Sequence, residues 1–306
     1  MLRIGTRKSK LALWQTKLVQ KLLQEEGQES TLLEIVSEGD KVLDTPLPLM
    51  GGKGVFTKAL DDALFAGEAD LAVHSLKDIP TDMPEGLVVA AILERANWQD
   101  ALVVRSDKSF LSKEDYVGVI ATSSNRRRAQ WLNHFAKHNT VDIRGNVQTR
   151  IKKLRESNWD ATVLAVAGLE RLGLNHEIAV YLDWMLPAPG QGAIAIVCRE
   201  NDSAVRGILS KLNHEETARC VNIERGFLHA LNGGCSAPIG ALAQVKDGKV
   251  YLETVLSRTD GSDEIRLKLE ADYAESADLG NQAAKQALVK GAADILNDLP
   301  KEKGLH

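Results

Sequence analysis

Apolar runs with the period of a strand alternate with segments of helical period along the first two thirds of the chain. The strand-like runs occupy residues 2–5, 31–36, 71–73, 117–121, 141–143 and 161–166. The helical segments between them are residues 57–66, residues 147–156, and stretches that begin at Asn125 and after Gly168. Because strands that alternate with helices usually pair in parallel, the pattern predicts an α/β protein with mixed, mostly parallel sheets covered on both faces.

A further helix is predicted just after the first strand. Leu11, Trp14, Leu18 and Leu22 share one face at helical spacing, and Ser9 stands where an N-cap is expected. The first strand and this helix therefore form the first βα unit.

The rhythm changes from about residue 215. One helix is followed by three strands, expected to be antiparallel, at residues 239–245, 249–257 and 265–271, and by a final helix that ends near residue 299. This pattern predicts a separate, small α+β domain. The Pro- and Gly-rich stretch at residues 186–192 is typical of a crossing between domains.

Length and composition indicate a soluble protein with more than one lobe. A chain of 306 residues suits two or three small domains with clefts between them. Hydrophobic residues make up 44% of the chain, yet no apolar run is long enough to span a bilayer, and the patch at residues 11–14 is too short for a signal peptide. Three cysteines without a Cys-x-x-Cys pair fit a reducing compartment. We therefore expect a cytoplasmic protein with no membrane partner.

Charge and histidine spacing exclude two further classes of partner. The net charge of -4 argues against bulk affinity for nucleic acid, so a cluster of arginines is expected to be a local site. His74 has no second histidine at metal-ligand spacing, and the cysteines do not supply a zinc site. No metal is expected.

Charged residues follow two of the predicted strands. Lys77 and Asp78 come after residues 71–73, and Arg144 and Gly145 come after residues 141–143. In sheets of this kind, ligands bind beyond the carboxyl ends of the strands. A carboxylate at such a strand end can act as an acid, a base or a counter-ion, although a plain surface Lys–Asp pair is the ordinary alternative.

A cluster of hydroxyl groups and arginines stands at the start of a predicted helix, at residues 122–127. Helix N-termini and guanidinium groups both favour carboxylate or phosphate. A solvated basic helix face is the alternative, and it suits Arg128 best. Further arginines near strand ends or first helical turns are Arg7, Arg144, Arg150 and Arg171. So many cations in equivalent positions predict a polyanionic ligand.

One cysteine stands apart from the other two. Cys235 follows two glycines that let the backbone turn tightly, and nearby cations would favour its reactive thiolate; a chemically idle loop cysteine is the alternative. Cys198 lies in an apolar run typical of a buried strand, and Cys220 gives no signal. The Gly-Gly-Lys-Gly sequence at residues 51–54 does not match a nucleotide-binding loop, and we expect a lid that carries one cation, Lys53.

At these residues the chain resembles the porphobilinogen deaminase family nearly end to end. The matching segments, in order, are Arg-Ile-Gly-Thr-Arg (3–7), Leu-Ala-Leu-Trp-Gln (11–15), Gly-Gly-Lys-Gly (51–54), His-Ser-Leu-Lys-Asp-Ile-Pro (74–80), Arg-Gly-Asn-Val (144–147), Ala-Val-Ala-Gly-Leu (165–169), Gly-Gln-Gly-Ala (190–193) and Gly-Gly-Cys (233–235). The resemblance implies three domains, the first two like periplasmic binding proteins and the third with a three-stranded antiparallel sheet. The implied boundaries are residues 1–93 with 193–210, then 99–186, then 215–306, so the first domain is discontinuous.

The family's chemistry is implied by the same resemblance. Such an enzyme is a transferase of tetrapyrrole biosynthesis that joins four porphobilinogen molecules head to tail with loss of ammonia and then releases hydroxymethylbilane by hydrolysis. Its cofactor is a dipyrromethane held by a thioether, here matched to Cys235. Asp78 is matched to the group that stabilises the azafulvenium-like cation and handles protons on the pyrrole nitrogens. The family also implies a monomer whose partners are porphobilinogen and its linear oligomers.

The remaining implied site residues divide into two sets. Residues matched to cofactor binding are Ser75, Lys77, Thr122, Ser123, Ser124, Arg126, Arg127, Arg144 and Gly145. Residues matched to substrate binding are Arg7, Ser9, Gln15, Lys53, Arg150, Arg171 and Gln191. The chain departs from the family pattern at Leu49, where a lysine is common, and at Asn125, where a leucine is common.

Two other readings compete with this one. A non-catalytic, two-lobed anion-binding or sensor protein would keep the arginine-lined cleft without needing Cys235 or Asp78. An RNA-binding module is disfavoured by the acidic balance and by the lack of interleaved aromatic residues.

Overall fold

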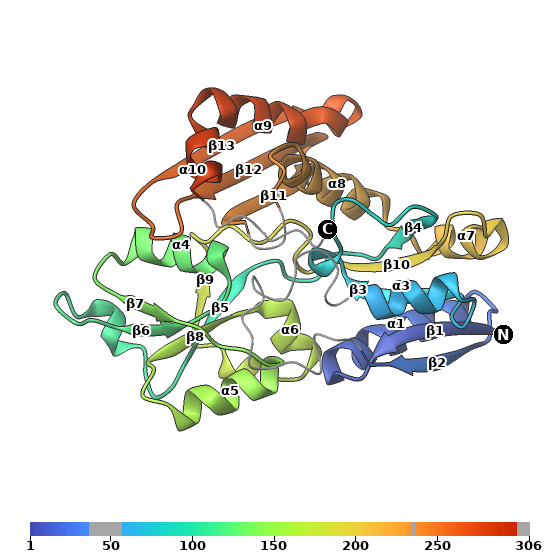
Figure 1. Cartoon of the computed structure of the whole chain (residues 1–306), viewed down its shortest axis with the longest axis horizontal. Helices are drawn as coiled ribbons and strands as arrows, with labels where there is room; N and C mark the ends of the chain where they lie inside the picture. The colour runs from blue at the N-terminus through green and yellow to red at the C-terminus, as the bar shows by residue number, and fades with distance from the viewer. Residues whose placement is uncertain (37–56, 234–236, 299–306) are drawn as a thin grey trace.

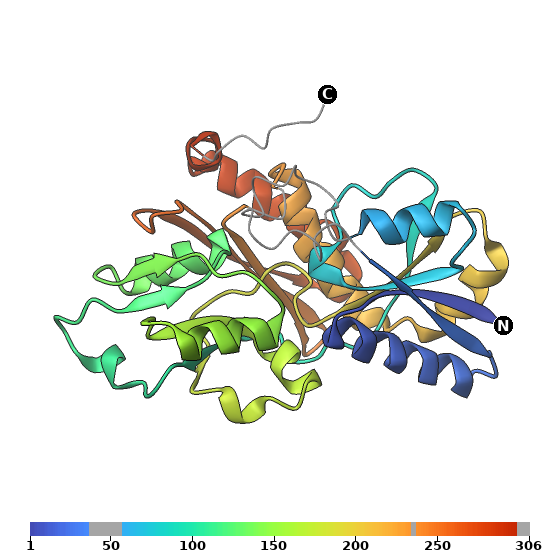
Figure 2. The same cartoon turned by 60° about the horizontal axis from the view of Figure 1, so that its bottom comes forward.

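Two five-stranded sheets and one three-stranded sheet organise the chain (Figure 1). The structure is a computed structural model, and it describes residues 1–36, 57–233 and 237–298. Figure 1 shows the two larger sheets side by side with the third above them, and Figure 2 shows the same arrangement from another side. Within the described ranges, no helix has both the length and the apolar character needed to cross a membrane.

The first sheet has the strand order β2-β1-β3-β10-β4. Its strands are β1 (Leu2–Arg7), β2 (Ser30–Ile35), β3 (Leu71–Ser75), β4 (Leu87–Ile92) and β10 (Ile194–Arg199). Strand β10 runs antiparallel to both β3 and β4, while β1 is parallel to β2 and β3, so four of the five strands point the same way. The chain therefore returns to its first sheet after about 100 residues elsewhere.

Alternate residues of these strands face two separate cores. On one face, Leu71 and Val73 pack with α1 (Lys10–Glu25) and α7 (Ser203–Leu209). On the other face, Ala72 packs with α3 (Lys58–Phe65). The sheet is thus buried on both sides, which explains its continuous apolar strands.

The second sheet repeats this plan with the order β7-β6-β8-β5-β9. Its strands are β5 (Asp100–Val104), β6 (Val119–Ala121), β7 (Asn139–Val141), β8 (Ala161–Ala165) and β9 (Val180–Leu182). Strand β5 is antiparallel to both of its neighbours, so again four of five strands run together. Helix α4 (Asn125–His134) covers one face, and α5 (Val147–Glu156) with α6 (Val166–Arg171) covers the other.

The C-terminal sheet is a simple antiparallel meander. It consists of β11 (Ile239–Lys246), β12 (Lys249–Ser257) and β13 (Glu264–Asp272), paired in chain order. The helices α8 (Glu215–Ala230), α9 (Leu279–Val289) and α10 (Ala292–Asn297) supply the residues that bury its apolar face, among them Phe227. Short 3-10 helices elsewhere are η2 (Leu76–Asp78), η3 (Ser109–Ser112), η4 (Asn175–Glu177), η5 (Ser210–Leu212) and η6 (Tyr273–Asp278).

Glu224 of α8 joins the C-terminal sheet to the crossing segment at residues 186–192. Its fully buried carboxylate accepts hydrogen bonds from the backbone nitrogens of Gly190 and Ala243, both at 2.8 Å, and pairs with Arg95 at 2.5 Å. Because a buried charge is costly unless all its partners are in place, this cluster fixes where the crossing segment meets the C-terminal domain.

The structure corrects several local predictions. In α1 the buried stripe is Ala12, Gln15, Thr16, Val19 and Leu23, whereas Trp14 is 39% exposed. The strand predicted at residues 141–143 lies at Asn139–Val141, the helix predicted after Gly168 already begins at Val166, and the final helix is two helices separated at Gly291, whose φ is +96°. The predicted fold class is confirmed, and the exact domain boundaries stay a prediction.

Candidate active site

A cavity of about 520 Å³ lies between the two larger sheets and is lined by residues from both of their domains. It is bordered by the carboxyl ends of β1, β3 and β8 and by the first turns of α1, α5 and α6. The predicted site residues that line it are Arg7, Ser9, Ser75, Lys77, Asp78, Arg127, Arg144, Gly145, Arg150 and Arg171. Position at the end of a strand or at the start of a helix therefore indicated the charged part of this wall.

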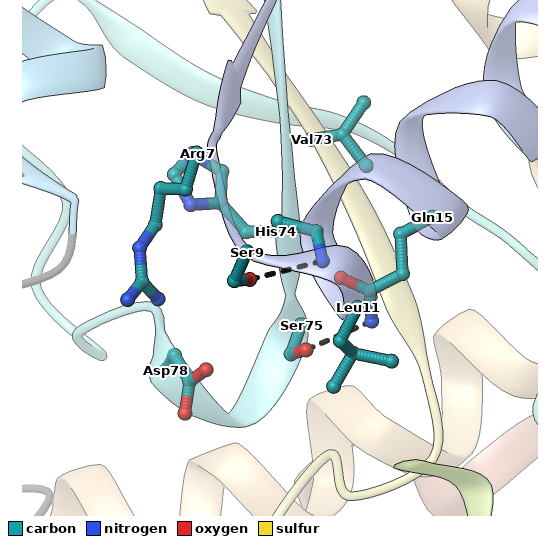
Figure 3. A pocket seen from close by; sticks show the side chains of 9 residues that line it. Arg7, Ser9, Leu11, Gln15, Val73, His74, Ser75 and Asp78 are labelled. Carbon is teal, nitrogen blue, oxygen red and sulfur yellow. Dashed lines mark hydrogen bonds between the residues drawn. The ribbon is translucent and has the colours of Figure 1, made fainter. Parts of the chain in front are cut away.

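Other predicted site residues lie elsewhere. Thr122, Ser123, Ser124, Arg126 and Gln191 are not on the cavity wall. Gln15 lines a smaller adjoining pocket of about 60 Å³, whose wall also includes His74 and Asp78 (Figure 3). Lys53 and Cys235 lie outside the described residues, as does the departure at Leu49.

Asp78 ends the short turn η2 that follows β3. Upstream, the turn is fixed to the sheet because the Leu76 nitrogen donates to the Ala193 carbonyl at 3.0 Å. Figure 3 shows the Arg7 guanidinium directed toward the side of the pocket where the Asp78 carboxylate lies, with Ser9 close by. Ser9 caps α1 as predicted, because its hydroxyl accepts from the Ala12 nitrogen at 3.2 Å. A carboxylate and a guanidinium thus border the same small pocket.

Gln15 and Ser75 link α1 to the end of β3. The Gln15 side-chain nitrogen donates to the Ser75 hydroxyl at 2.9 Å, and Gln15 is only 2% exposed. This bond holds the strand end against the first helix.

His74 is buried beside these groups. Burial, and after it the charge of Arg7, lowers the pKa of His74 to about 4, so the imidazole is neutral near neutral pH. Its Nε2 atom has no hydrogen-bond partner within the part of the chain that the structure describes.

Asp100 organises the wall contributed by the second sheet, and no sequence pattern pointed to this residue. Its carboxylate is fully buried and accepts from Arg126 at 2.7 Å and from Arg127 at 2.7 and 3.1 Å. Despite burial, which alone would raise it, the pKa of Asp100 falls far below its usual range because the two guanidinium groups stabilise the charged form. Arg126 also donates to the Leu186 carbonyl at 2.7 Å, so its guanidinium is engaged inside the protein rather than at the cavity wall.

A chain of hydrogen bonds connects Asp100 to Lys77. The Gln191 side-chain nitrogen donates to Asp100 at 3.0 Å, and the Gln191 oxygen accepts from the Lys77 ammonium at 3.3 Å. Burial, followed by the charge of Arg127, lowers the pKa of Lys77 to about 8. Gln191 therefore contacts Lys77, a residue of the cavity wall, without lining the cavity itself.

The hydroxyl groups of residues 122–124 hold loops in place. The Ser123 hydroxyl both accepts from the Ile143 nitrogen and donates to the Ile143 carbonyl, each at 2.9 Å. The Ser124 hydroxyl accepts from the Arg127 nitrogen at 3.5 Å, and the Thr122 hydroxyl accepts from the Ser124 nitrogen at 3.3 Å. They fix the start of α4, from which Arg127 reaches the cavity.

Gly145 and Arg150 form a unit at the start of α5. Gly145 has a φ of +118°, and a Cβ atom there would lie 2.7 Å from the Thr149 side chain, so only glycine suits this turn. The Gly145 carbonyl accepts from Arg150 at 2.8 Å. Burial lowers the pKa of Arg150 to about 10, which leaves it charged at neutral pH.

Arg171 connects α6 to the first sheet's side of the cavity. It donates to the Gly192 carbonyl at 2.7 Å, and its guanidinium carbon lies 5.6 Å from the centre of the Trp14 ring. Burial lowers the pKa of Arg171 to about 10. Trp14 is not on the cavity wall, but its ring packs against Arg171, which is on that wall.

Comparisons with known proteins match almost the whole chain. A family model described as "Porphobilinogen deaminase, dipyromethane cofactor binding domain" matches residues 2–207, and one described as "Porphobilinogen deaminase, C-terminal domain" matches residues 218–289. The chain belongs to the porphobilinogen deaminase family. The porphobilinogen deaminase of Pelobacter propionicus is 42% identical over 303 residues, covering 97% of each chain, and that of Syntrophotalea carbinolica is 43% identical over 299 residues, covering 96% of this chain and 95% of its own.

A solved structure of the methionine binding protein MetQ is also similar to this chain. The similar region covers 69% of this chain and 89% of the MetQ chain, with 12% sequence identity and a TM-score of 0.45.

Family membership confirms the predictions of family, enzyme class and cofactor type. The cofactor-binding family model covers both larger sheets, and therefore the whole wall of the cavity. A dipyrromethane carries acetate and propionate groups, and the arginines and the lysine that line the cavity would pair with them, so the donor set fits the group. Among the described residues, no cluster of histidine, cysteine, aspartate or glutamate could hold a metal ion.

Proposed function

We propose that this chain joins four porphobilinogen molecules head to tail on a dipyrromethane attached to Cys235, and then releases hydroxymethylbilane. The observation that carries this proposal is the placement of Asp78 in one cavity with arginines and a lysine contributed from both larger sheets. When bound, the dipyrromethane supplies the free pyrrole position to which the first substrate unit is joined. The protein's own residues do the rest.

Asp78 is proposed to stabilise the cation that the substrate becomes when ammonia leaves. The carbon–nitrogen bond breaks with its electron pair on nitrogen, and the remaining methylene-pyrrole carries a positive charge. A carboxylate about 4 Å from that charge stabilises it by roughly 4 kcal/mol at an effective dielectric near 20. Moving pyrrole protons through the same carboxylate would add about 10²- to 10⁴-fold in rate.

The cations are proposed to bind the acetate and propionate groups. Arg127, Arg144 and Arg150 line the second sheet's side of the cavity, and Arg7 and Lys77 line the first. The lowered pKa of Lys77 supports this role, because the cavity without its anionic ligand already disfavours one more positive charge. A carboxylate bound there would raise the pKa of Lys77 and so further favour its charged form.

We also propose that the chain acts as a monomer in the cytoplasm. Cys198 and Cys220 are buried and unpaired, which suits a reducing compartment. The test of the monomer is the mass in solution from sedimentation or light scattering.

The experiment that tests the function first is the intact mass of freshly purified protein. We expect an excess over the sequence mass equal to two porphobilinogen units less two ammonias, located on the peptide that contains Cys235. Cys235→Ser is expected to lose this excess, and Cys220→Ser serves as the matched control that keeps it. An adduct that survives in Cys235→Ser would place the anchor elsewhere.

The catalytic part is tested with Asp78→Asn. This variant is expected to keep its cofactor mass and its thermal unfolding midpoint while losing turnover of porphobilinogen. Near-normal product formation would refute the role proposed for Asp78. A protein that binds anions but is unaffected by replacement of both Asp78 and Cys235 would instead be the non-catalytic anion-binding protein.

A further inference from the structure

The segment that follows Asp78 is held by a helix of the C-terminal domain. Helix α8 places Arg225 against residues 79–80, and the guanidinium donates one hydrogen bond to the Ile79 carbonyl at 2.9 Å and another to the Pro80 carbonyl at 2.8 Å. One helical turn further along α8, the His229 ring lies 3.2 Å from the Asp82 carboxylate. Two successive positions on one helix face therefore contact the chain just beyond Asp78.

The two carbonyls bound by Arg225 are buried and need a partner. Ile79 is 3% exposed, Pro80 is buried, and neither belongs to a helix or a strand. A buried carbonyl without a partner costs free energy comparable to a lost hydrogen bond. Arginine suits this pair because its planar group presents two N–H donors in a fixed geometry. Lysine would keep the charge but lacks this fixed pair of donors, so it would hold the two carbonyls less firmly.

Asp78 lies between two anchors of different origin. Upstream, the β3–β10 pairing and the bond from the Leu76 nitrogen to Ala193 belong to the first sheet. Downstream, the anchor is Arg225, which comes from the C-terminal domain. The position of the Asp78 carboxylate thus depends on a contact between domains.

We infer that Arg225 is a positioning residue for Asp78, acting through the backbone of Ile79 and Pro80. This inference rests on the catalytic role proposed above for Asp78. Without the guanidinium, the turn from Asp78 to Pro80 keeps its upstream anchor but loses its downstream one, and the carboxylate moves relative to the reacting carbon. Misplacement of about 1 Å can cost about 10²-fold in rate.

His229 makes the smaller contribution. Its side chain and that of Asp82 are 60% and 51% exposed, and exposed ion pairs contribute little. We therefore expect His229→Gln to change the rate by no more than about twofold.

The test uses holoenzyme of Arg225→Gln and Arg225→Lys, each checked for its cofactor by intact mass. The matched control is Arg219→Gln on the same helix. The Arg219 guanidinium carbon lies 5.3 Å from the centre of the Tyr273 ring, whereas Arg225 is the residue that binds the Ile79 and Pro80 carbonyls. Arg225→Gln is expected to lower kcat between about 10- and 100-fold with KM changed less than about twofold. Arg225→Lys is expected to recover part of the loss, and Arg219→Gln to keep normal kcat.

Hydrogen exchange of the peptide that spans residues 76–82 gives a readout that does not depend on activity. The Ile79 amide donates to the Leu76 carbonyl at 3.1 Å within the turn, so it should exchange faster in Arg225→Gln than in Arg219→Gln. A kcat within about twofold of normal in Arg225→Gln, or a rise in KM with kcat unchanged, would overturn the inference. If Asp78→Asn turns out fully active while Arg225→Gln is impaired with faster exchange at residue 79, it is the proposed role of Asp78 that fails, and the turn positions a different group.

Discussion

The replacement Asp100→Asn tests how the cationic wall of the cavity is held. Asp100 is completely buried, with 0% of its surface accessible. Its carboxylate accepts hydrogen bonds from Arg126, Arg127 and Gln191. Asparagine keeps the size of the side chain but leaves two guanidinium groups, 4% and 6% exposed, without their counter-charge. Removing one partner of a buried ion pair costs about 3–5 kcal/mol, which corresponds to a melting temperature lower by between about 6 and 20 °C.

The matched control is Asp142→Asn. Asp142 also pairs with an arginine of α4, Arg128, at 2.6 Å, but the two side chains are 56% and 28% exposed. Such a pair contributes about 0–1 kcal/mol. Urea unfolding of the two variants and the parent, followed by circular dichroism, gives the comparison directly.

The pH dependence of the difference has a definite sign. Because the pKa of Asp100 is lowered in the folded state, its stabilising contribution is present above its ordinary pKa near 3.8 and is lost as the pH falls below that value. The gap between the parent and Asp100→Asn should therefore be largest near neutral pH and shrink in acid. A loss below about 1 kcal/mol near neutral pH, equal to that of Asp142→Asn, would refute this account of the cluster.

Three further predictions follow from single contacts. Trp14→Leu should lower kcat/KM about three- to tenfold by releasing Arg171, whereas Trp14→Phe, which keeps an aromatic face, should lose less; equal losses in steady-state assays would contradict the cation–π role. His74→Gln should make the stability less sensitive to acid. Because the folded pKa of His74, about 4, lies below the ordinary 6.5, the parent should lose about 2 kcal/mol of unfolding free energy between about pH 7 and pH 5. The measurement is the urea midpoint, which should fall over this range in the parent and stay constant in the variant. Lys77→Met should raise the free energy of unfolding of the cofactor-free protein below about pH 8. This advantage over the parent should fade toward pH 10.5, because the folded parent loses its lysine proton in that range while the unfolded chain still holds it. An unchanged difference in the free energy of unfolding across that range would count against a lowered pKa for Lys77.

The spacing of apolar residues predicted most of the secondary structure, because each helix or strand buries the apolar residues that recur on one of its faces. The predicted helix at residues 147–156 matches α5 at both ends, and the three predicted C-terminal strands match β11 to β13 within about a residue. In α1 the pattern failed because Gln15 and Thr16 are buried by hydrogen bonds to Ser75 and Thr6, whereas Trp14 lies beside Arg171. A polar residue that is buried with a hydrogen-bond partner cannot be identified as buried from the spacing of apolar residues.

The partners of charged residues were beyond the reach of the sequence pattern. Arg126 and Arg127 looked equivalent at a helix start, yet only Arg127 reaches the cavity, and both bind Asp100, 26 and 27 positions earlier. Strand β5, which begins with Asp100, was not predicted, and its place between β8 and β9 follows from long-range pairing. Arg225 was likewise missed, because its partners are backbone carbonyls about 145 positions away in the sequence.

The hydrogen bonds of the Gln191 side chain join the two larger sheets, and they differ in length. Gln191, on the segment that crosses between the sheets, donates to Asp100 at 3.0 Å and to the Trp98 carbonyl at 2.8 Å, whereas its bond from Lys77 is longer, at 3.3 Å. Longer hydrogen bonds are weaker. The pKa of Lys77 is lowered by burial first and then by the charge of Arg127, and the charges of Asp78 and Asp100 do not fully offset these effects. A carboxylate of the ligand would compete for Lys77 on better terms than the neutral amide. The bond from Lys77 is therefore the contact of the Gln191 side chain that a bound carboxylate would replace first, while the bonds of this side chain to Asp100 and Trp98 remain.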